Sequence, residues 1–333
     1  MTDLFLALDA GNSKTVAVVT DERGAVRGLG RGGRGDIYNA ASPDDAVAAV
    51  FGAADAALAE ADASGARVVW AAFRVAGVDW PEDERWWAER IAQRYPGLGG
   101  FSVKNDGFAS LRLGSPDGTG VGITVGTGPA IAARAADGAE ACTGWWVFDD
   151  LGGFGIANRA FEAVSRAWMG LGPQTALTAE LLGLFEEGEV YDLHHSFTRR
   201  FGAREWAERL RATRSVLRLA ADGDSVALRI VVDQADALVG YAEWVARQVS
   251  AEPGEAVPIV LNGSIVTSET PVLRLALTER LEQRFPGCPI RVAAASPLTG
   301  CVLDALAEGG VLLSEAERDA VIATRYPDGF LAT

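Results

Sequence analysis

Residues 4–19 read LFLALDAGNSKTVAVV, a short apolar run, a polar turn and a second apolar run. This pattern predicts a β-hairpin whose turn consists of small polar residues. Residues 121–133, VGITVGTGPAIAA, repeat the arrangement around a second turn of small residues. A further turn closes each unit at nearly the same spacing, at 21–24 and at 137–138. The similarity indicates an internal duplication with one copy in each half, although two unrelated hairpins would give the same pattern.

Strands and helices alternate along the rest of the chain, which predicts an α/β fold with helices covering the sheets. Further strands are expected at 67–75, 101–103, 257–261 and 290–293. Helices are expected at 43–58, 81–94, 107–113, 158–169, 175–185, 204–221, 225–249, 271–284, 297–308 and 314–326. The stretch at 28–35 (GLGRGGRG) is predicted to be a loop, because glycine at this density disfavours regular structure.

The composition limits the class of protein and its partners. The 333 residues include 30 Lys and Arg against 45 Asp and Glu, a formal net charge of −15. At about 150 residues per domain, this length indicates about two domains. The negative field argues against nucleic acid or an acidic membrane as a partner, and no apolar run reaches the ~18 residues of a membrane span. Three cysteines without metal-ligand spacing and a start without a secretory signal lead us to expect a cytoplasmic protein.

Three turns of small residues each follow an apolar strand and are candidate binding sites for an anion. Glycine lets backbone N–H groups approach an anion closely, and the Lys14 ammonium group adds a charge. The preceding Asp9 could hold a magnesium ion through water. An ordinary hairpin turn explains the first turn equally well by itself. The residues concerned are Gly11, Asn12, Ser13, Lys14 and Thr15; Gly126, Thr127 and Gly128; and Gly263 and Ser264.

Two carboxylates precede expected helices and have two interpretations each. Asp106 could take a proton from a substrate hydroxyl, but a helix N-cap explains the local pattern as well and is commoner. Asp150 lies in Asp149-Asp150 before a flexible turn. It could accept hydrogen bonds from ligand hydroxyls or cap the helix expected near residue 158.

Six motifs occur in an order that resembles the N-acetylglucosamine kinase family. They are LALDAGNSKT near the start, NDGFASL at 105–111, GITVGTGPAIAAR at 122–134, a Gly-Trp and Asp-x-Gly-Gly element at 144–153, VLNGSI at 260–265 and SPLTGCVLDAL at 296–306. This family belongs to the BadF/BadG-type ATPase group of the acetate/sugar-kinase, actin and heat-shock-chaperone superfamily. No single motif is very specific, but the six together cover residues 4–306.

The resemblance implies a fold of two ribonuclease-H-like (actin-type ATPase) α/β domains around a central cleft. A linker candidate at 114–120 (GSPDGTG) places the first domain at 1–115, with the first turn and Asp106. The larger second domain is then expected at 116–312, with the other two turns. By the same resemblance, the last helix, within 313–333, packs back on the first domain.

The resemblance also implies an activity and a role for each candidate residue. The activity is ATP-dependent phosphorylation of a hydroxyl, the 6-OH, of an amino sugar such as N-acetylglucosamine or glucosamine, with Mg²⁺ beside Asp9. The first two turns would bind phosphates, the third would bind adenosine, and Asp106 would be the general base. The partner is a small-molecule sugar, and the family is compatible with a homodimer. The residues that would bind the sugar are Asp36, Asn39, Asn105, Gly144 and Asp150.

Departures from the family pattern concern the sugar more than the nucleotide. The third turn, Asn262-Gly263-Ser264, lacks the double glycine of many relatives, and residues 149–153 read DDLGG.

Three alternatives to an amino-sugar kinase remain. A type III pantothenate kinase has a first motif similar to residues 9–12 but lacks the two late motifs. A reductase-activator ATPase needs cysteines in a cluster-binding motif, and none of the three cysteines lies in one. A non-catalytic sugar-responsive ATPase or regulator is the third alternative, and no DNA-binding segment or basic patch supports it.

Overall fold

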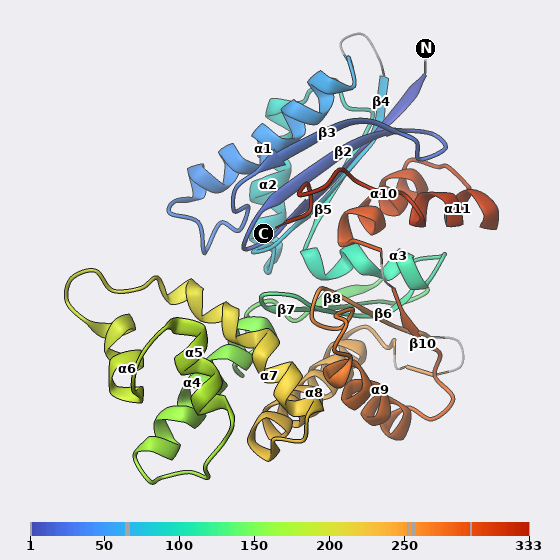
Figure 1. The fold of residues 1–333 in the computed structure, drawn as a ribbon. Helices are drawn as coiled ribbons and strands as arrows, with labels where there is room; N and C mark the ends of the chain where they lie inside the picture. Colours follow the sequence, from blue (N-terminus) through green and yellow to red (C-terminus); the bar gives the residue numbers. More distant parts are fainter. Residues whose placement is uncertain (1, 64–66, 252, 255–256, 294, 333) are drawn as a thin grey trace.

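The computed structural model of the chain describes residues 2–63, 67–251, 253–254, 257–293 and 295–332. Its strands form two five-stranded sheets, sheet A and sheet B, one in each half (Figure 1). Sheet A consists of β1 (Asp3–Ala10), β2 (Thr15–Asp21), β3 (Val26–Gly32), β4 (Arg67–Val75) and β5 (Phe101–Lys104). Sheet B consists of β6 (Gly120–Val125), β7 (Pro129–Arg134), β8 (Glu140–Cys142), β9 (Ile259–Asn262) and β10 (Ile290–Val292).

The two sheets share one strand order. Sheet A runs β3-β2-β1-β4-β5, and sheet B runs β8-β7-β6-β9-β10. In both sheets the first three strands form an antiparallel meander, and the last two run parallel to the central strand. The α/β fold is therefore confirmed, and the two hairpins predicted as a duplication occupy equivalent places in the two sheets.

Helices separate and cover the two sheets. They are α1 (Pro43–Glu60), α2 (Pro81–Arg94), η1 (Asp106–Ser110), α3 (Leu111–Gly114), η2 (Gly144–Trp146), α4 (Gly152–Trp168), α5 (Leu177–Phe185), α6 (Val190–Thr198), η3 (Trp206–Arg211), α7 (Ala212–Ala221), α8 (Ser225–Gln248), α9 (Val272–Arg284), α10 (Pro297–Glu308) and α11 (Glu315–Ile322). The last helix ends at residue 322, where the sequence pattern predicted residue 326. Within the described ranges, no helix is both long enough and apolar enough to cross a membrane.

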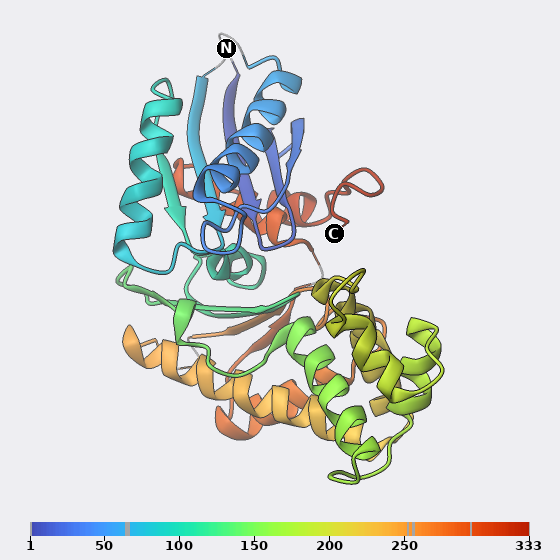
Figure 2. The same ribbon diagram turned by 90° about the vertical axis from the view of Figure 1, so that its left-hand side faces the viewer.

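Side chains of β1 alternate between two cores, as the period of a strand requires. Leu4, Leu6 and Leu8 pack with residues of α1 and α2. Phe5 and Ala7 pack on the other face with residues of α10 and α11. Sheet A is thus covered on both faces by helices that are far apart in the sequence (Figure 2). Since α10 lies on sheet A, the chain returns to the first half before residue 312, where we expected the larger domain to end.

Sheet B has a different cover on each face. One face packs against α4, α8 and α9, with Ile123 and Ile131 in the shared core. The other face contacts η1 and α3 through Phe108, Leu111 and Ala132. The short segment from η1 to α3 therefore lies between sheet B and α10 (Figure 1). This segment follows β5 directly, so it carries Asp106 into the space between the two halves.

The glycine-rich stretch at 28–35 contradicts the prediction of a loop, because its first part is the edge strand β3. Its glycines alternate along the strand and face α1. A Cβ atom at Gly28 would lie 2.1 Å from the Ala57 carbonyl oxygen, and one at Gly30 would lie 1.9 Å from the Ala53 carbonyl oxygen. Glycine here allows a helix backbone to approach a strand backbone, which is a known reason for glycine within strands.

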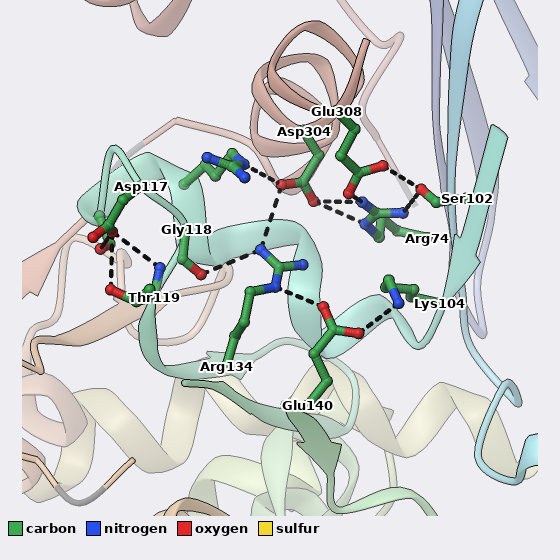
Figure 3. A network of polar contacts seen from close by, with 12 residues as sticks. Arg74, Ser102, Lys104, Asp117, Gly118, Thr119, Arg134, Glu140, Asp304 and Glu308 are labelled. Carbon is green, nitrogen blue, oxygen red and sulfur yellow. Dashed lines mark hydrogen bonds and ion pairs between the residues drawn. The ribbon is translucent and has the colours of Figure 1, made fainter. Parts of the chain in front are cut away.

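A polar network joins the two halves (Figure 3). Arg74 of β4 is completely buried and pairs with Asp304 of α10 at 2.8 Å and with Glu308 at 2.7 Å. Asp304 also accepts a hydrogen bond from Arg112 Nε at 2.8 Å. On the side of sheet B, Glu140 pairs with Arg134 at 2.6 Å and with Lys104 of β5 at 2.5 Å.

The close contact between β3 and α1 predicts the effect of a single methyl group. We expect Gly30→Ala to lower the free energy of unfolding by about 1–3 kcal/mol, because α1 must move to accommodate the new Cβ atom. Gly33→Ala is the matched control, since a Cβ atom there meets nothing within 4 Å. Urea unfolding of both variants tests this. A Gly30→Ala variant as stable as Gly33→Ala would contradict the packing described here.

Candidate active site

The turns that follow β1, β5, β6 and β9 line one cavity of about 680 Å³. These strands are among the parallel ones of the two sheets, and ligands of α/β sheets bind at the carboxyl ends of such strands. All three turns that the sequence indicated as anion sites meet here. The candidate residues in the lining are Asp9, Gly11, Asn12, Ser13, Lys14, Gly126, Thr127, Gly128, Gly263 and Ser264.

The first two turns face each other across this cavity. The first is closed by a hydrogen bond from Gly11 N–H to the Lys14 carbonyl oxygen at 2.9 Å, and the second by one from Gly126 N–H to the Gly128 carbonyl oxygen at 3.0 Å. The hydroxyl groups of Ser13 and Thr127 lie 3.3 Å apart. The two halves of the duplication therefore contribute equivalent turns to one site.

The third turn depends on a glycine with positive φ. Gly263 has φ +96°, and a Cβ atom there would lie 2.4 Å from the Val125 carbonyl oxygen. The Asn262 side chain fixes the approach to this turn. Its Oδ1 accepts the Gly263 N–H at 2.6 Å, and its Nδ2 donates to the carbonyl oxygens of Ala293 and Ala295 at 2.6 and 2.9 Å. Asn262 thus joins the third turn to the segment that leads into α10.

A second, smaller cavity of about 180 Å³ lies beside the first. Four of the residues that the resemblance assigned to sugar binding line it, namely Asp36, Asn39, Asn105 and Gly144. Asn12 and Asp106 line both cavities. The rings of Tyr38 and Trp145, which come from opposite halves, meet edge to face at 5.3 Å in the wall of the smaller cavity.

Asp106 is the first residue of η1 and not its cap. The cap is Asn105, whose Oδ1 accepts the Gly107 N–H at 2.9 Å. The Asn105 amide nitrogen donates to Asp79 Oδ1 at 2.8 Å. Both ends of the Asn105 amide are therefore engaged, and the Asp106 carboxylate is left available between the two cavities.

Burial raises the pKa of the carboxyl groups at this junction. Burial raises the pKa of Asp106 to about 8, and the negative charges of Asp9 and Asp79 contribute. Burial also raises the pKa of Asp9 to about 6, against the opposing charge of Lys14. The pKa of Lys14 is lowered, mainly by burial. A carboxyl group with a pKa near neutral pH is suited to exchange protons with a substrate.

The residues around Asp9 fit a divalent cation. Asp9 and Asp106 both line the larger cavity, and a cation there would relieve the repulsion between them. In the described part of the chain, no three His, Cys, Asp or Glu side chains converge on one point. Mg²⁺ commonly binds through one or two carboxylates, phosphate oxygens and several waters. The side chains present therefore suit an ion that arrives with a phosphorylated ligand.

Asp79 is a residue of the smaller cavity that the sequence analysis did not identify. Burial and the charges of Asp36 and Asp83 raise its pKa to about 6. Gly144 packs against it so closely that a Cβ atom at Gly144 would lie 2.9 Å from the Asp79 Cβ atom. The signal in the sequence was its place just beyond the end of β4, at the same edge as Asp9 and Asp106.

Two candidate residues lie outside both cavities. Thr15 is the first residue of β2 and is completely buried opposite Ala10, so it belongs to the strand and not to the turn. Asp150 is exposed to solvent, and its backbone carbonyl accepts a hydrogen bond from Gln234 Nε2 at 2.5 Å. The neighbouring Asp149 carboxylate accepts one from the Tyr241 hydroxyl at 2.7 Å. The structure therefore does not bring Thr15 and Asp150 to the site.

Most of the chain matches a known protein family. The model of the BadF/BadG/BcrA/BcrD ATPase family matches residues 6–307. The chain belongs to this family. Membership of the BadF/BadG/BcrA/BcrD ATPase family implies that the chain uses ATP.

Relatives of this BadF/BadG/BcrA/BcrD family member include sugar kinases. An N-acetyl-D-glucosamine kinase of Dictyostelium discoideum is 23% identical over 320 residues, which cover 91% of this chain and 98% of the relative. A candidate N-acetylglucosamine kinase from Chromobacterium violaceum has a similar structure, with a TM-score of 0.66, 22% identity and coverage of 91% and 98%. A ROK family glucokinase from Streptomyces griseus, solved with glucose and AMPPNP, has a TM-score of 0.54, 17% identity and coverage of 91% and 98%. These structures confirm the two-domain actin-type fold.

The raised pKa of Asp106 predicts that this residue destabilises the protein without ligand. Its folded-state pKa near 8 lies above the unfolded value of about 3.9, so the folded state binds more protons between these values. The contribution of Asp106 to stability therefore falls as pH rises from about 4 to 8.

We expect Asp106→Asn to raise the free energy of unfolding at pH 7.5 and to change it less at pH 4.5. Denaturant unfolding in the absence of nucleotide measures both values. A variant that is less stable than the wild type at pH 7.5 would contradict this prediction.

Proposed function

We propose that this protein is an ATP-dependent kinase that phosphorylates a hydroxyl, the 6-OH, of an amino sugar such as N-acetylglucosamine or glucosamine. The observation that supports this most directly is the place of Asp106, which lines both cavities. One cavity is lined by three small-residue turns, of which the first two are of the kind that bind phosphates, and the other by side chains of the kind that bind hydroxyl groups. Transfer of a phosphoryl group needs these two sites to meet at a base.

In this proposal each residue has a defined role. The sugar occupies the smaller cavity, with Asp36, Asn39 and Asn105 as hydrogen-bond partners. Asp106 accepts the proton of the sugar hydroxyl. The hydroxyl oxygen forms a bond to the γ-phosphorus of ATP while the bond between that phosphorus and ADP breaks. The first two turns and Lys14 hold the phosphates. Mg²⁺ supplies charge neutralisation when bound with ATP, and Asp9 would hold it through water.

The charge of the smaller cavity favours a sugar over an acid. Asp36, Asp79 and Asp106 all line it, and no lysine or arginine lines it among the residues that the structure describes. A substrate with its own carboxylate, such as pantothenate, would be repelled by these groups. Neutral or amino sugars present hydroxyl and amine donors that carboxylates accept well. This argues against the pantothenate kinase alternative.

A cytoplasmic location and a homodimer complete the proposal. The homodimer follows from the family resemblance, and the cytoplasmic location from the sparse use of cysteine. The three cysteines, Cys142, Cys288 and Cys301, are free thiols, as expected of a protein in a reducing compartment.

The function can be tested by a screen of candidate substrates. ADP release is measured with Mg²⁺ and ATP in the presence of N-acetylglucosamine, glucosamine, glucose, N-acetylmuramic acid or pantothenate. We expect turnover with an amino sugar and none with the two acids. An absence of turnover with every sugar would refute the sugar-kinase proposal, and turnover with pantothenate would support the alternative.

The role of Asp106 predicts the behaviour of one variant in the same assay. Asp106→Asn removes the proton acceptor but keeps the shape of the side chain, so kcat is expected to fall by ~10²-fold or more. Binding of ATP, measured by calorimetry, is expected to change little. Normal turnover by this variant would exclude Asp106 as the base.

A variant at Asp79 is expected to affect the KM for the sugar and not the KM for ATP. Asp79 accepts a hydrogen bond from Asn105 and lines the smaller cavity but not the larger one. Asp79→Ala removes a charge-assisted hydrogen bond of about 1.5 kcal/mol, so we expect the KM for the sugar to rise about tenfold. The KM for ATP is expected to stay near the wild-type value. Asp192→Ala is the control for the loss of one carboxylate, because Asp192 is exposed on α6 and lines neither cavity. An equal change of the KM for the sugar in Asp79→Ala and Asp192→Ala would contradict a role for Asp79 in the site.

A further inference from the structure

The C-terminal segment after α11 forms one wall of the larger cavity. This segment lies beyond residue 307, where the match to the family ends. Its contribution was not predicted, because the sequence pattern continued the last helix to residue 326. The residues of this region that line the cavity are Ile322, Ala323, Thr324, Arg325, Tyr326 and Leu331.

Side chains from sheet A and α10 hold this segment in place. Arg31 of β3 donates hydrogen bonds to the carbonyl oxygens of Gly329 at 2.5 Å and Phe330 at 3.0 Å, and also to Ala332 at 2.5 Å. The rings of Tyr326 and Phe330 stack with their centres 5.7 Å apart. Tyr326, Phe330 and Leu331 also make apolar contacts on the α10 side of sheet A. These contacts and the hydrogen bonds of Arg31 hold the segment in the wall of the larger cavity.

The segment adds a positive charge to a cavity that has few. The charged residues in the lining are Asp9, Asp106, Lys14 and Arg325. Lys14 is partly buried and already interacts with Asp9. Arg325 is exposed, and no ion pair or hydrogen bond of its side chain occurs among the described residues. Its guanidinium group is therefore available to an anion.

The ligand of this cavity requires such a charge. ATP is a polyanion, while the chain has a formal net charge of −15. The start of α10 lies in the same lining through Ser296, Pro297 and Thr299, and the positive end of this 12-residue helix adds to the favourable field. A guanidinium group binds phosphate oxygens with two parallel hydrogen bonds, which makes arginine well suited to this position.

We propose that Arg325 binds the phosphate groups of ATP and that the C-terminal segment is a part of the nucleotide site. This inference depends on the nucleotide part of the proposed function and is independent of the sugar. Arg325 does not line the smaller cavity, so its effect belongs to the nucleotide alone.

Direct binding of nucleotide tests the proposal. Calorimetry with Mg²⁺ and ATP, without sugar, is carried out on the wild type, Arg325→Ala, Arg325→Lys and Arg200→Ala. Arg200 is the control, since it is exposed and lies outside the cavity. We expect the Kd for ATP to rise about tenfold in Arg325→Ala, less in Arg325→Lys, and not at all in Arg200→Ala.

Binding of adenosine, which has no phosphate, distinguishes a contact between Arg325 and phosphate from a general effect on the cavity wall. We expect Arg325→Ala to bind adenosine as the wild type does, and its affinity for ATP to depend less on salt. Unchanged ATP affinity in Arg325→Ala, or an equal loss for ATP and adenosine, would overturn the proposal. A wild-type protein that does not bind ATP would overturn the nucleotide assignment as well, so the two failures are distinguishable.

Discussion

The arrangement of the molecule depends on the burial of one arginine. Arg74 is completely buried in β4, and a buried charge is tolerated only with close partners. Asp304 and Glu308 of α10 supply them, so α10 must lie against β4 (Figure 3). Removal of one partner from such a pair typically costs about 3–5 kcal/mol. The start of α10 lines the larger cavity and the end of β4 leads to Asp79 in the smaller one, so this ion pair also fixes the two cavities relative to each other.

The same network reaches the walls of the smaller cavity. Lys104 immediately precedes Asn105, and Glu140 lies in the short strand that leads to Gly144. Their ion pair joins β5 of one half to β8 of the other. Asn105 and Gly144 line the smaller cavity from opposite halves. Both are therefore held by an ion pair that lies only a few residues away in the sequence. Asp106, between these walls, keeps its position without being used as a cap.

The sequence was sufficient to predict the fold where the pattern was local. Apolar runs such as 4–8 and 121–125 marked the strands, and the order of six motifs indicated two related halves around a cleft. It was insufficient where a contact between distant residues decides the structure. The glycines of β3 suggested a loop because the proximity of α1 is not visible along the chain. Thr15 and Asp150 were assigned to the site by their neighbours in sequence, but strand pairing and the start of α4 direct them elsewhere. Asp79 has no motif around it, and only the edge that it shares with Asp9 reveals its place.

The return of α10 to sheet A has a consequence for the growing polypeptide. The strands of sheet A are complete in sequence at Lys104, but Asp304 leaves the ribosome about two hundred residues later. Until then, Arg74 lacks its carboxylates, and the face of the sheet that carries Phe5 and Ala7 lacks the cover of α10 and α11. Such exposed apolar surface makes nascent chains prone to aggregation. The first half can therefore reach its final stability only near the end of translation, and prematurely ended chains would be ready targets for chaperones and proteases.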